Sequence, residues 1–137
     1  MVKMENILKV TIEISFGEFL DRMSILKIKK ERIKNKHKLK YVKKEYNALN
    51  KGFRECMQVC DPVLRKQIKK LYKELYEINN KLWDIEDAIR VKEKKEEFDH
   101  SFVNIARKVY INNDERFRIK NAINELLNSP FKEIKDY

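Results

Sequence analysis

A row of large aliphatic residues in the middle of the chain constrains its fold more than any other feature. The row repeats at spacings of four, three, four, three and four: Leu71, Leu75, Ile78, Leu82, Ile85 and Ile89. Because this spacing puts all six side chains on one stripe of an α-helix, it is typical of a long helix packed lengthwise against others. The charged run KEKKEE that follows predicts where the helix ends.

Composition extends the helical expectation to the whole chain. The 137 residues include only two Gly and two Pro, and 39% are charged. Few turn formers and many good helix formers indicate an all-α protein. We expect a helical bundle of four to five helices, with long antiparallel helices and a short extended N-terminal lead-in. At this length, residues 1–137 are expected to form a single all-α domain.

The first three helices have recognisable boundaries. Residues 8–14 alternate in polarity and predict the extended lead-in. Ser15 can cap the first helix while Glu18 reaches back to the Ser15 amide. This helix carries apolar residues on two faces, which is typical of a helix packed between neighbours. A second helix is predicted over about 39–59, and Asp61-Pro62 begins the third.

The last part of the sequence predicts two helices. The first of them covers about 99–111. Asn113 or Asp114 can cap the second, which reaches about residue 127, because Asn and Asp are common capping residues. The junction between them would combine free N–H groups with nearby cations, and such a site suits an anionic group of a ligand.

Positive charge is concentrated in the N-terminal half of a chain with a net charge of +10. Residues 1–60 carry 15 Lys or Arg and 7 Asp or Glu, and the stretch Lys27 to Lys44 holds ten basic residues and one Glu. This stretch has the composition of a polyanion-binding patch. Its single aromatic residue, Tyr41, offers little for stacking on bases, so a solvated surface is the competing interpretation.

Targeting and cysteine signals are sparse. The N-terminus lacks an apolar run long enough for a signal peptide, and no stretch approaches the ~20 apolar residues of a membrane span, so a cytoplasmic protein without a membrane partner is expected. Cys56 and Cys60 share a helix face and are expected to be reduced, part-buried thiols. His37 and His100 are not at zinc-finger spacing, so no metal is expected.

A polar stripe runs beside the apolar row of the third helix. One residue further on, the same spacing selects Tyr72, Tyr76, Asn79, Trp83, Glu86 and Arg90. A shallow polar pocket between helices can be built from such residues. The alternative is that Trp83 covers the core and that Glu86 pairs with Arg90, a contact worth a few tenths of a kcal/mol.

Two further polar clusters are candidates for the same pocket. The first helix contributes Glu18, Asp21 and Lys29. The last part of the chain contributes Arg107, Tyr110, Asn113, Asp114, Arg116 and Lys120. A site that includes all three clusters requires that they meet in space.

Several segments resemble a family of small bacterial proteins of unknown function. They are IEISFGEFLDR, ILKIKKERI, NNKLWDIEDAIR, ARKVYINNDER, INELLNS and EIKDY. The likeness covers about two thirds of the chain and leaves residues 36–60 unmatched. It implies a gene neighbourhood of sugar-nucleotide and surface-polysaccharide functions. Beyond the three clusters, its polar residues correspond here to Glu13, Ser15, Asp87, Ser129, Glu133, Lys135 and Tyr137.

Three functions follow as hypotheses. The first is a helical accessory or binding protein whose polar groove holds an anionic small molecule derived from a nucleotide or a sugar. Arg90, Arg107, Arg116 and Lys120 would neutralise the anion, and Trp83 or Tyr110 would stack on a ring.

The second hypothesis is an enzyme of the nucleotide-pyrophosphatase type that uses Glu18, Asp21 and Glu86 as metal ligands or as acid and base. The third is a binder of nucleic acid or another polyanion through residues 27–44. No glycine-rich phosphate loop, zinc motif or nucleophile elbow occurs, and no cofactor is expected. A homodimer is compatible with any of the three.

Overall fold

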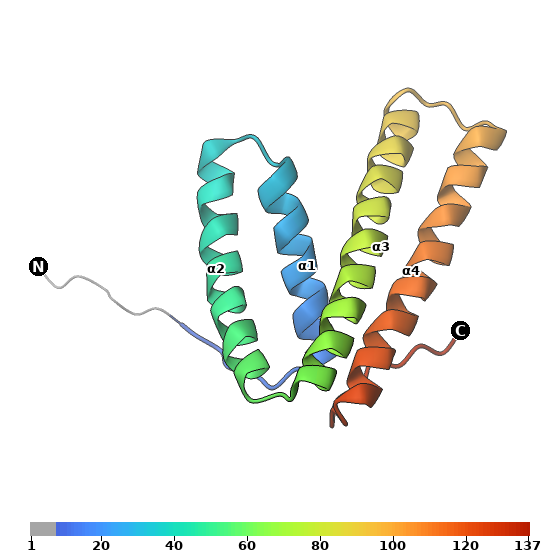
Figure 1. The fold of residues 1–137 in the computed structure, drawn as a ribbon. Helices are drawn as coiled ribbons and strands as arrows, with labels where there is room; N and C mark the ends of the chain where they lie inside the picture. Colours follow the sequence, from blue (N-terminus) through green and yellow to red (C-terminus); the bar gives the residue numbers. More distant parts are fainter. Residues whose placement is uncertain (1–7) are drawn as a thin grey trace, which may run out of the picture.

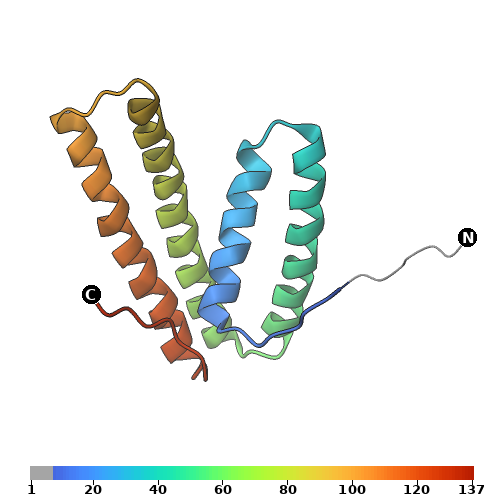
Figure 2. The ribbon, with the colours of Figure 1, turned by 180° about the vertical axis from the view of Figure 1, so that it is seen from behind.

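The computed structural model describes residues 8–137, and this part of the chain contains four helices and no strand. The helices are α1 (Phe16–Arg32), α2 (Lys36–Gln58), α3 (Pro62–Lys94) and α4 (His100–Leu126). Figures 1 and 2 show two antiparallel hairpins, α1–α2 and α3–α4, which meet at one end and splay apart at the other. The all-α class and the long antiparallel helices are therefore confirmed.

The apolar core lies at the end where the two hairpins meet. Its buried residues are Leu20, Met23, Met57, Ile68, Leu75, Ile78, Ile119 and Ile123. They come from the first half of α1, the last turn of α2, the first half of α3 and the last turns of α4. Because α1 packs against all three other helices, the prediction from its two apolar faces is confirmed.

Side-chain caps begin all four helices. Ser15 Oγ accepts a hydrogen bond from Glu18 N (3.1 Å), which confirms the predicted cap. Asp61 Oδ1 accepts one from Leu64 N (2.8 Å) at the predicted start of the third helix. Asn35 accepts from Lys38 N, so α2 begins at Lys36, three residues before the predicted start. A side-chain oxygen placed in this way satisfies one N–H of the first turn, which otherwise has no partner in the helix.

The two predicted C-terminal helices form one continuous helix, α4, so the predicted junction at Asn113 and Asp114 is wrong. Asn112 Nδ2 donates to the carbonyl of Lys108, one turn earlier in the helix (2.7 Å), and Asn113 Oδ1 faces Arg116 Nη1 at 3.4 Å. The cap-forming side chains therefore find partners along the helix, and tertiary packing overrides their preference for helix ends. There is consequently no free helix N-terminus at this position.

Two other expectations concern the thiols and the membrane. Cys56 and Cys60 are free and half-buried, and burial raises the pKa of the Cys56 thiol. No helix among residues 8–137 combines the length and the apolar composition that a membrane span requires. The expectation that the N-terminus is no signal peptide rests on residues 1–10, of which 1–7 lie outside the described residues.

Candidate functional site

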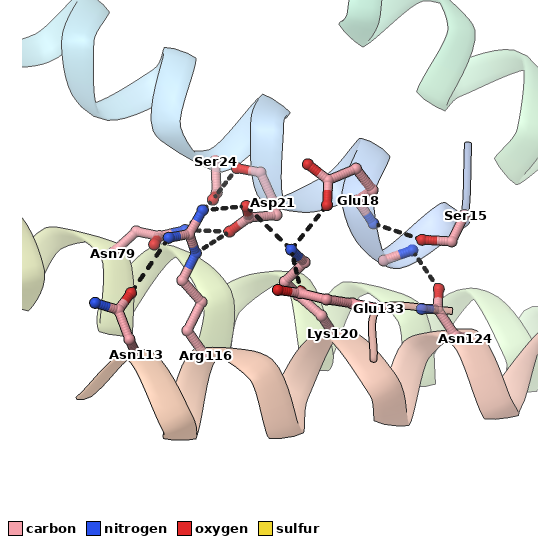
Figure 3. A network of polar contacts seen from close by, with 11 residues as sticks. Ser15, Glu18, Asp21, Ser24, Asn79, Asn113, Arg116, Lys120, Asn124 and Glu133 are labelled. Atoms are coloured by element: carbon pink, nitrogen blue, oxygen red, sulfur yellow. Dashed lines mark hydrogen bonds and ion pairs between the residues drawn. The ribbon is translucent and has the colours of Figure 1, made fainter. Parts of the chain in front are cut away.

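A buried carboxylate on α1 is the centre of a polar network between α1, α3 and α4 (Figure 3). The Asp21 side chain receives two hydrogen bonds from Arg116, Nε to Oδ1 at 2.8 Å and Nη2 to Oδ2 at 2.5 Å. Asn79 Nδ2 donates to Asp21 Oδ1 (2.9 Å) and to Ser24 Oγ (2.8 Å). The polar residues of the three helices therefore meet in space, which the site hypothesis required.

The network provides hydrogen-bond partners for both charges of its central pair. Asp21 is 1% exposed, and a buried carboxylate is costly unless it is paired and hydrogen-bonded. The hydrogen bonds to Asp21 are the main cause of the raised pKa of Arg116. A two-pronged guanidinium–carboxylate pair also fixes the orientation of both groups. Arg116 is thus held in one position by α1.

A second cation joins the network one helical turn further along α4. Lys120 Nζ lies 2.8 Å from Glu18 Oε2, 2.8 Å from Glu133 Oε2 and 3.9 Å from Asp21 Oδ2. Burial lowers the pKa of Lys120, but the bonds to Glu133 and Glu18 outweigh burial and raise it overall. Glu133 belongs to the C-terminal segment, which is thereby attached to α4. The Glu18 carboxylate, predicted to reach the Ser15 amide, pairs with Lys120.

The close approach of α1 to α4 depends on a glycine. Gly17 N donates to Asn124 Oδ1 at 2.8 Å, and a Cβ at position 17 would lie 2.4 Å from the carbonyl oxygen of Lys120. No side chain larger than a hydrogen atom fits there unless the helices move apart. Gly17 therefore allows α1 to lie close enough for Asp21 to reach Arg116.

A cavity of about 460 Å³ lies next to the network, between α1 and the α3–α4 hairpin. Its volume lies within the usual range for small-molecule sites. Its lining residues are Ile25, Ile28, Asn79, Leu82, Trp83, Glu86, Asp87, Arg90, Asn113 and Arg116. Of the six residues that helical spacing selected on α3, the last four, from Asn79 to Arg90, line this cavity, whereas Tyr72 and Tyr76 do not.

The charged side chains of the cavity have few partners. Glu86 Oε2 and Arg90 Nε are 3.9 Å apart, and their side chains are 44% and 79% exposed. Arg116 Nη1 makes a single hydrogen bond among the described residues, a long one to Asn113 Oδ1 at 3.4 Å. The guanidinium carbon of Arg32 lies 5.9 Å from the centroid of the Trp83 ring, while Arg32 bonds Asp84. The cavity thus offers an indole, carboxylates and incompletely bonded guanidinium groups.

Four of the predicted site residues belong neither to this cavity nor to the network around Asp21. Arg107 and Tyr110 are exposed on α4, and Asp114 is exposed and faces Lys135 at 3.6 Å. Lys29 lines a second cavity of about 300 Å³, together with Glu18, Asp21 and Arg116. The other nine predicted site residues lie in the network or line the cavity: Glu18, Asp21, Asn79, Trp83, Glu86, Arg90, Asn113, Arg116 and Lys120.

Comparison with known protein families gives one match. Residues 9–137 match the model of a family of unknown function, DUF6165. The chain belongs to the DUF6165 family. The match includes α2, which the sequence motifs left unmatched, and it confirms the expected membership in a family of unknown function. No curated protein and no solved structure matches the chain.

The network of this DUF6165 member includes residues that the sequence hypothesis left out. Asn124 continues the α4 face of Arg116 and Lys120 at the next spacing of four, so extending that row would have found it. Gly17 is a second signal, because glycine within a helix is unfavourable unless close packing requires it. Ser24 has no comparable signal in the sequence.

The enzyme hypothesis depends on where the acidic residues of the DUF6165 chain lie. Glu18 and Asp21 face Lys120 and Arg116, whereas Glu86 lines the cavity. Across residues 8–137, no three His, Cys, Asp or Glu side chains are grouped so that they could hold a metal ion.

Proposed function

We propose that this protein binds a small molecule in the cavity beside the Asp21–Arg116 pair, and that the ligand carries one anionic group next to a ring with hydroxyl groups. Sugar acids, sugar phosphates and nucleotides with a single phosphate belong to this class. The observation that carries the proposal is that Asn79, Trp83, Glu86 and Arg90 line one cavity with Arg116.

The two arginines suit the anionic group of the ligand. Arg116 is oriented through Nε and Nη2 by Asp21, and Nη1 has only the long contact with Asn113 among the described residues. A donor held in place by other bonds loses little conformational freedom when a ligand binds, which favours affinity. Arg90 is largely exposed and can move to close on the same group.

The remaining lining residues suit the rest of the molecule. Glu86, Asp87 and Asn113 offer oxygen acceptors for ligand hydroxyl groups. Trp83, Ile25 and Ile28 offer apolar surface against which a sugar or base ring can lie. Because two carboxylates stand beside two guanidinium groups, the cavity favours a ligand with hydroxyl donors and one anionic group over a polyanion.

The test is a fluorescence titration of Trp83, the only tryptophan of the chain. Nucleotides, nucleotide-sugars, sugar phosphates and sugar acids are added at low and at high salt. We expect a saturable change with one of these classes. Arg90→Ala should weaken that binding by about 10- to 100-fold, the range for a hydrogen bond to a charged group. Glu86→Gln should weaken it as well while helicity by circular dichroism stays unchanged.

Arg107→Ala is the matched control, because it removes the same side chain from an exposed position outside the cavity. It should leave affinity within about twofold of the wild type. A flat response to the whole panel, or equal losses in Arg90→Ala and Arg107→Ala, would contradict the proposal. If a ligand saturates the Trp83 signal, the same ligand is assayed for turnover, which tests the enzyme hypothesis directly.

The polyanion hypothesis rests on a different part of the molecule. The exposed lysines of its segment lie at the α1–α2 turn and in the first half of α2: Lys30, Lys34, Lys36, Lys38, Lys40, Lys43 and Lys44. Retention on heparin or DNA through these residues would fall steeply with salt and would not respond to Glu86→Gln. Such retention together with a flat Trp83 response would favour this second function.

A further inference from the structure

The segment before α1, residues 8–14, exposes an unusual amount of aliphatic surface. Every second residue of this lead-in segment is a large aliphatic one, with exposed fractions of 96% for Leu8, 87% for Val10, 70% for Ile12 and 41% for Ile14. The segment has no helix, turn or bend, and Figures 1 and 2 show that it leads away from the helices. Contiguous apolar surface of this kind is a feature of interaction sites.

The alternation gives the segment two different faces. In an extended chain successive side chains point to opposite sides, so the four aliphatic residues share one face and Lys9, Thr11 and Glu13 share the other. An extended segment also offers a row of backbone N–H and C=O groups to another strand. Residues 8–137 include no strand with which it could pair.

The sequence of the segment is complementary to itself in one antiparallel register. If two copies pair with Thr11 opposite Thr11, Lys9 of each copy faces Glu13 of the other. The same register places the aliphatic residues of both copies on one face, with Val10 opposite Ile12. A parallel arrangement in register would place Lys9 opposite Lys9 and Glu13 opposite Glu13, which is unfavourable.

We propose that the lead-in segment is a dimerisation element, and that two copies of this chain associate through an antiparallel two-stranded ribbon centred on Thr11. Eight aliphatic side chains then gather on one face of the ribbon, and two Lys9–Glu13 pairs lie on the other. Because an isolated two-stranded ribbon is only marginally stable in water, the dimer is weak and depends on chain concentration. In this ribbon the aliphatic side chains of one copy pack sideways against those of the second copy, as cross-strand pairs on the same face.

Sedimentation equilibrium over the micromolar concentration range tests this proposal. The wild type should show a reversible monomer–dimer equilibrium. Lys9→Glu should weaken it at least about tenfold, because each ribbon then has two carboxylate pairs in place of two ion pairs. Glu13→Lys should weaken it equally, with two ammonium pairs. Both positions lie outside the helices, so circular dichroism should be unchanged.

Mixing the two single variants tests the register itself. A Lys9→Glu chain paired with a Glu13→Lys chain has opposite charges at both positions, so the mixture should form heterodimers with near wild-type affinity. The double variant should dimerise alone for the same reason. Lys43→Glu, the same charge change at an exposed site on α2, should leave the equilibrium unaltered.

Three results would overturn the proposal. They are a wild type that stays monomeric throughout the concentration range, a dimer that is indifferent to both single variants, and single variants that fail to associate when mixed.

Discussion

The polar network around Asp21 and the cavity beside it are built from the same three helices, yet their charged groups are used differently. In the network, Asp21 is 1% exposed and is bound by Arg116 and Asn79 at hydrogen-bond distances. In the cavity, Glu86 and Arg90 are 3.9 Å apart, with Glu86 half-exposed and Arg90 largely open to solvent. Arg116 belongs to both regions.

This difference separates a structural role from a binding role. Charges that satisfy one another fix the positions of the helices, and they have little capacity left for a ligand. Charges with few partners contribute little to stability but can exchange water for a ligand. The network therefore holds α1, α3 and α4 together and orients Arg116, whereas the cavity keeps its polar groups available.

Replacing an aspartate in each region should separate the two roles most clearly. Asp21→Ala leaves the Arg116 guanidinium without its partner, and breaking a buried pair in this way typically costs 3 kcal/mol or more. We expect the free energy of unfolding to fall by about 3 kcal/mol, since 29% of the Arg116 side chain stays exposed. Urea unfolding followed by circular dichroism measures the change.

Asp87→Ala is the matched substitution, because it removes the same side chain from an exposed position on the cavity. Its effect on the free energy of unfolding should stay within about 0.5 kcal/mol. If the two variants were equally stable, the division between a paired structural region and an open binding region would be wrong.

Two glycine substitutions test the close packing that positions the network. At Gly17 a Cβ would meet the Lys120 carbonyl oxygen at 2.4 Å, whereas at Gly52 its nearest neighbour would be Phe19 Cζ at 3.8 Å. Gly17→Ala should destabilise the protein by about 1–3 kcal/mol through overpacking. Gly52→Ala should be neutral or stabilise it by up to about 1 kcal/mol, because alanine is favoured within a helix. Thermal and urea unfolding would measure both.

The Gly17 substitution also tests whether ligand binding at the cavity depends on the close approach of α1 to α4. Because Gly17→Ala moves α1 away from α4, it should weaken ligand binding at the cavity as well as stability. A Gly17→Ala protein with wild-type stability and wild-type binding would show that the close approach of α1 to α4 is unnecessary for either region.

The smallest expected effect is a fall in the free energy of unfolding at alkaline pH. The pKa of Lys120 is raised in the folded protein above its ordinary value of 10.5. The stability that its charge contributes is therefore complete below the unfolded-state pKa and is lost as pH rises through the folded-state pKa. The free energy of unfolding should fall from pH ~10 upward, and Lys120→Met should show a shallower fall.

Lys43→Met serves as the control for this pH series, because Lys43 is exposed on α2. It should follow the wild-type curve. Identical slopes for Lys120→Met and the wild type would indicate that Lys120 has the same pKa in the folded and unfolded chains, against the network described here.

The local features of the fold could be read from single stretches of sequence. The apolar row of α3 predicted a helix whose buried residues include Leu75, Ile78, Leu82 and Ile85. The caps at Ser15 and Asp61 depend on residues three positions apart, so they too were predictable. The shared stripe of Asn79, Trp83, Glu86 and Arg90 followed from helical spacing alone.

Where local and tertiary preferences conflict, the sequence was a poor guide. The run Asn112–Asp114 favours a helix end, yet α4 continues through it because α4 packs along α1 and α3. Arg107 has the same residue type as the cavity residues Arg90 and Arg116, but α4 places both Arg107 and Tyr110 at exposed positions. Side-chain chemistry does not specify which turn of a helix faces a neighbour.

The sequence by itself determined that this protein is a set of long helices, and it determined which residues share a face of each helix. The tertiary structure alone decided that the faces of α1, α3 and α4 meet at Asp21, and that the hairpins splay apart beside a cavity. The physical reason is that helical periodicity is a local property of the backbone. Contact between helices depends on distances set by the whole core and, here, on the single absent side chain at Gly17.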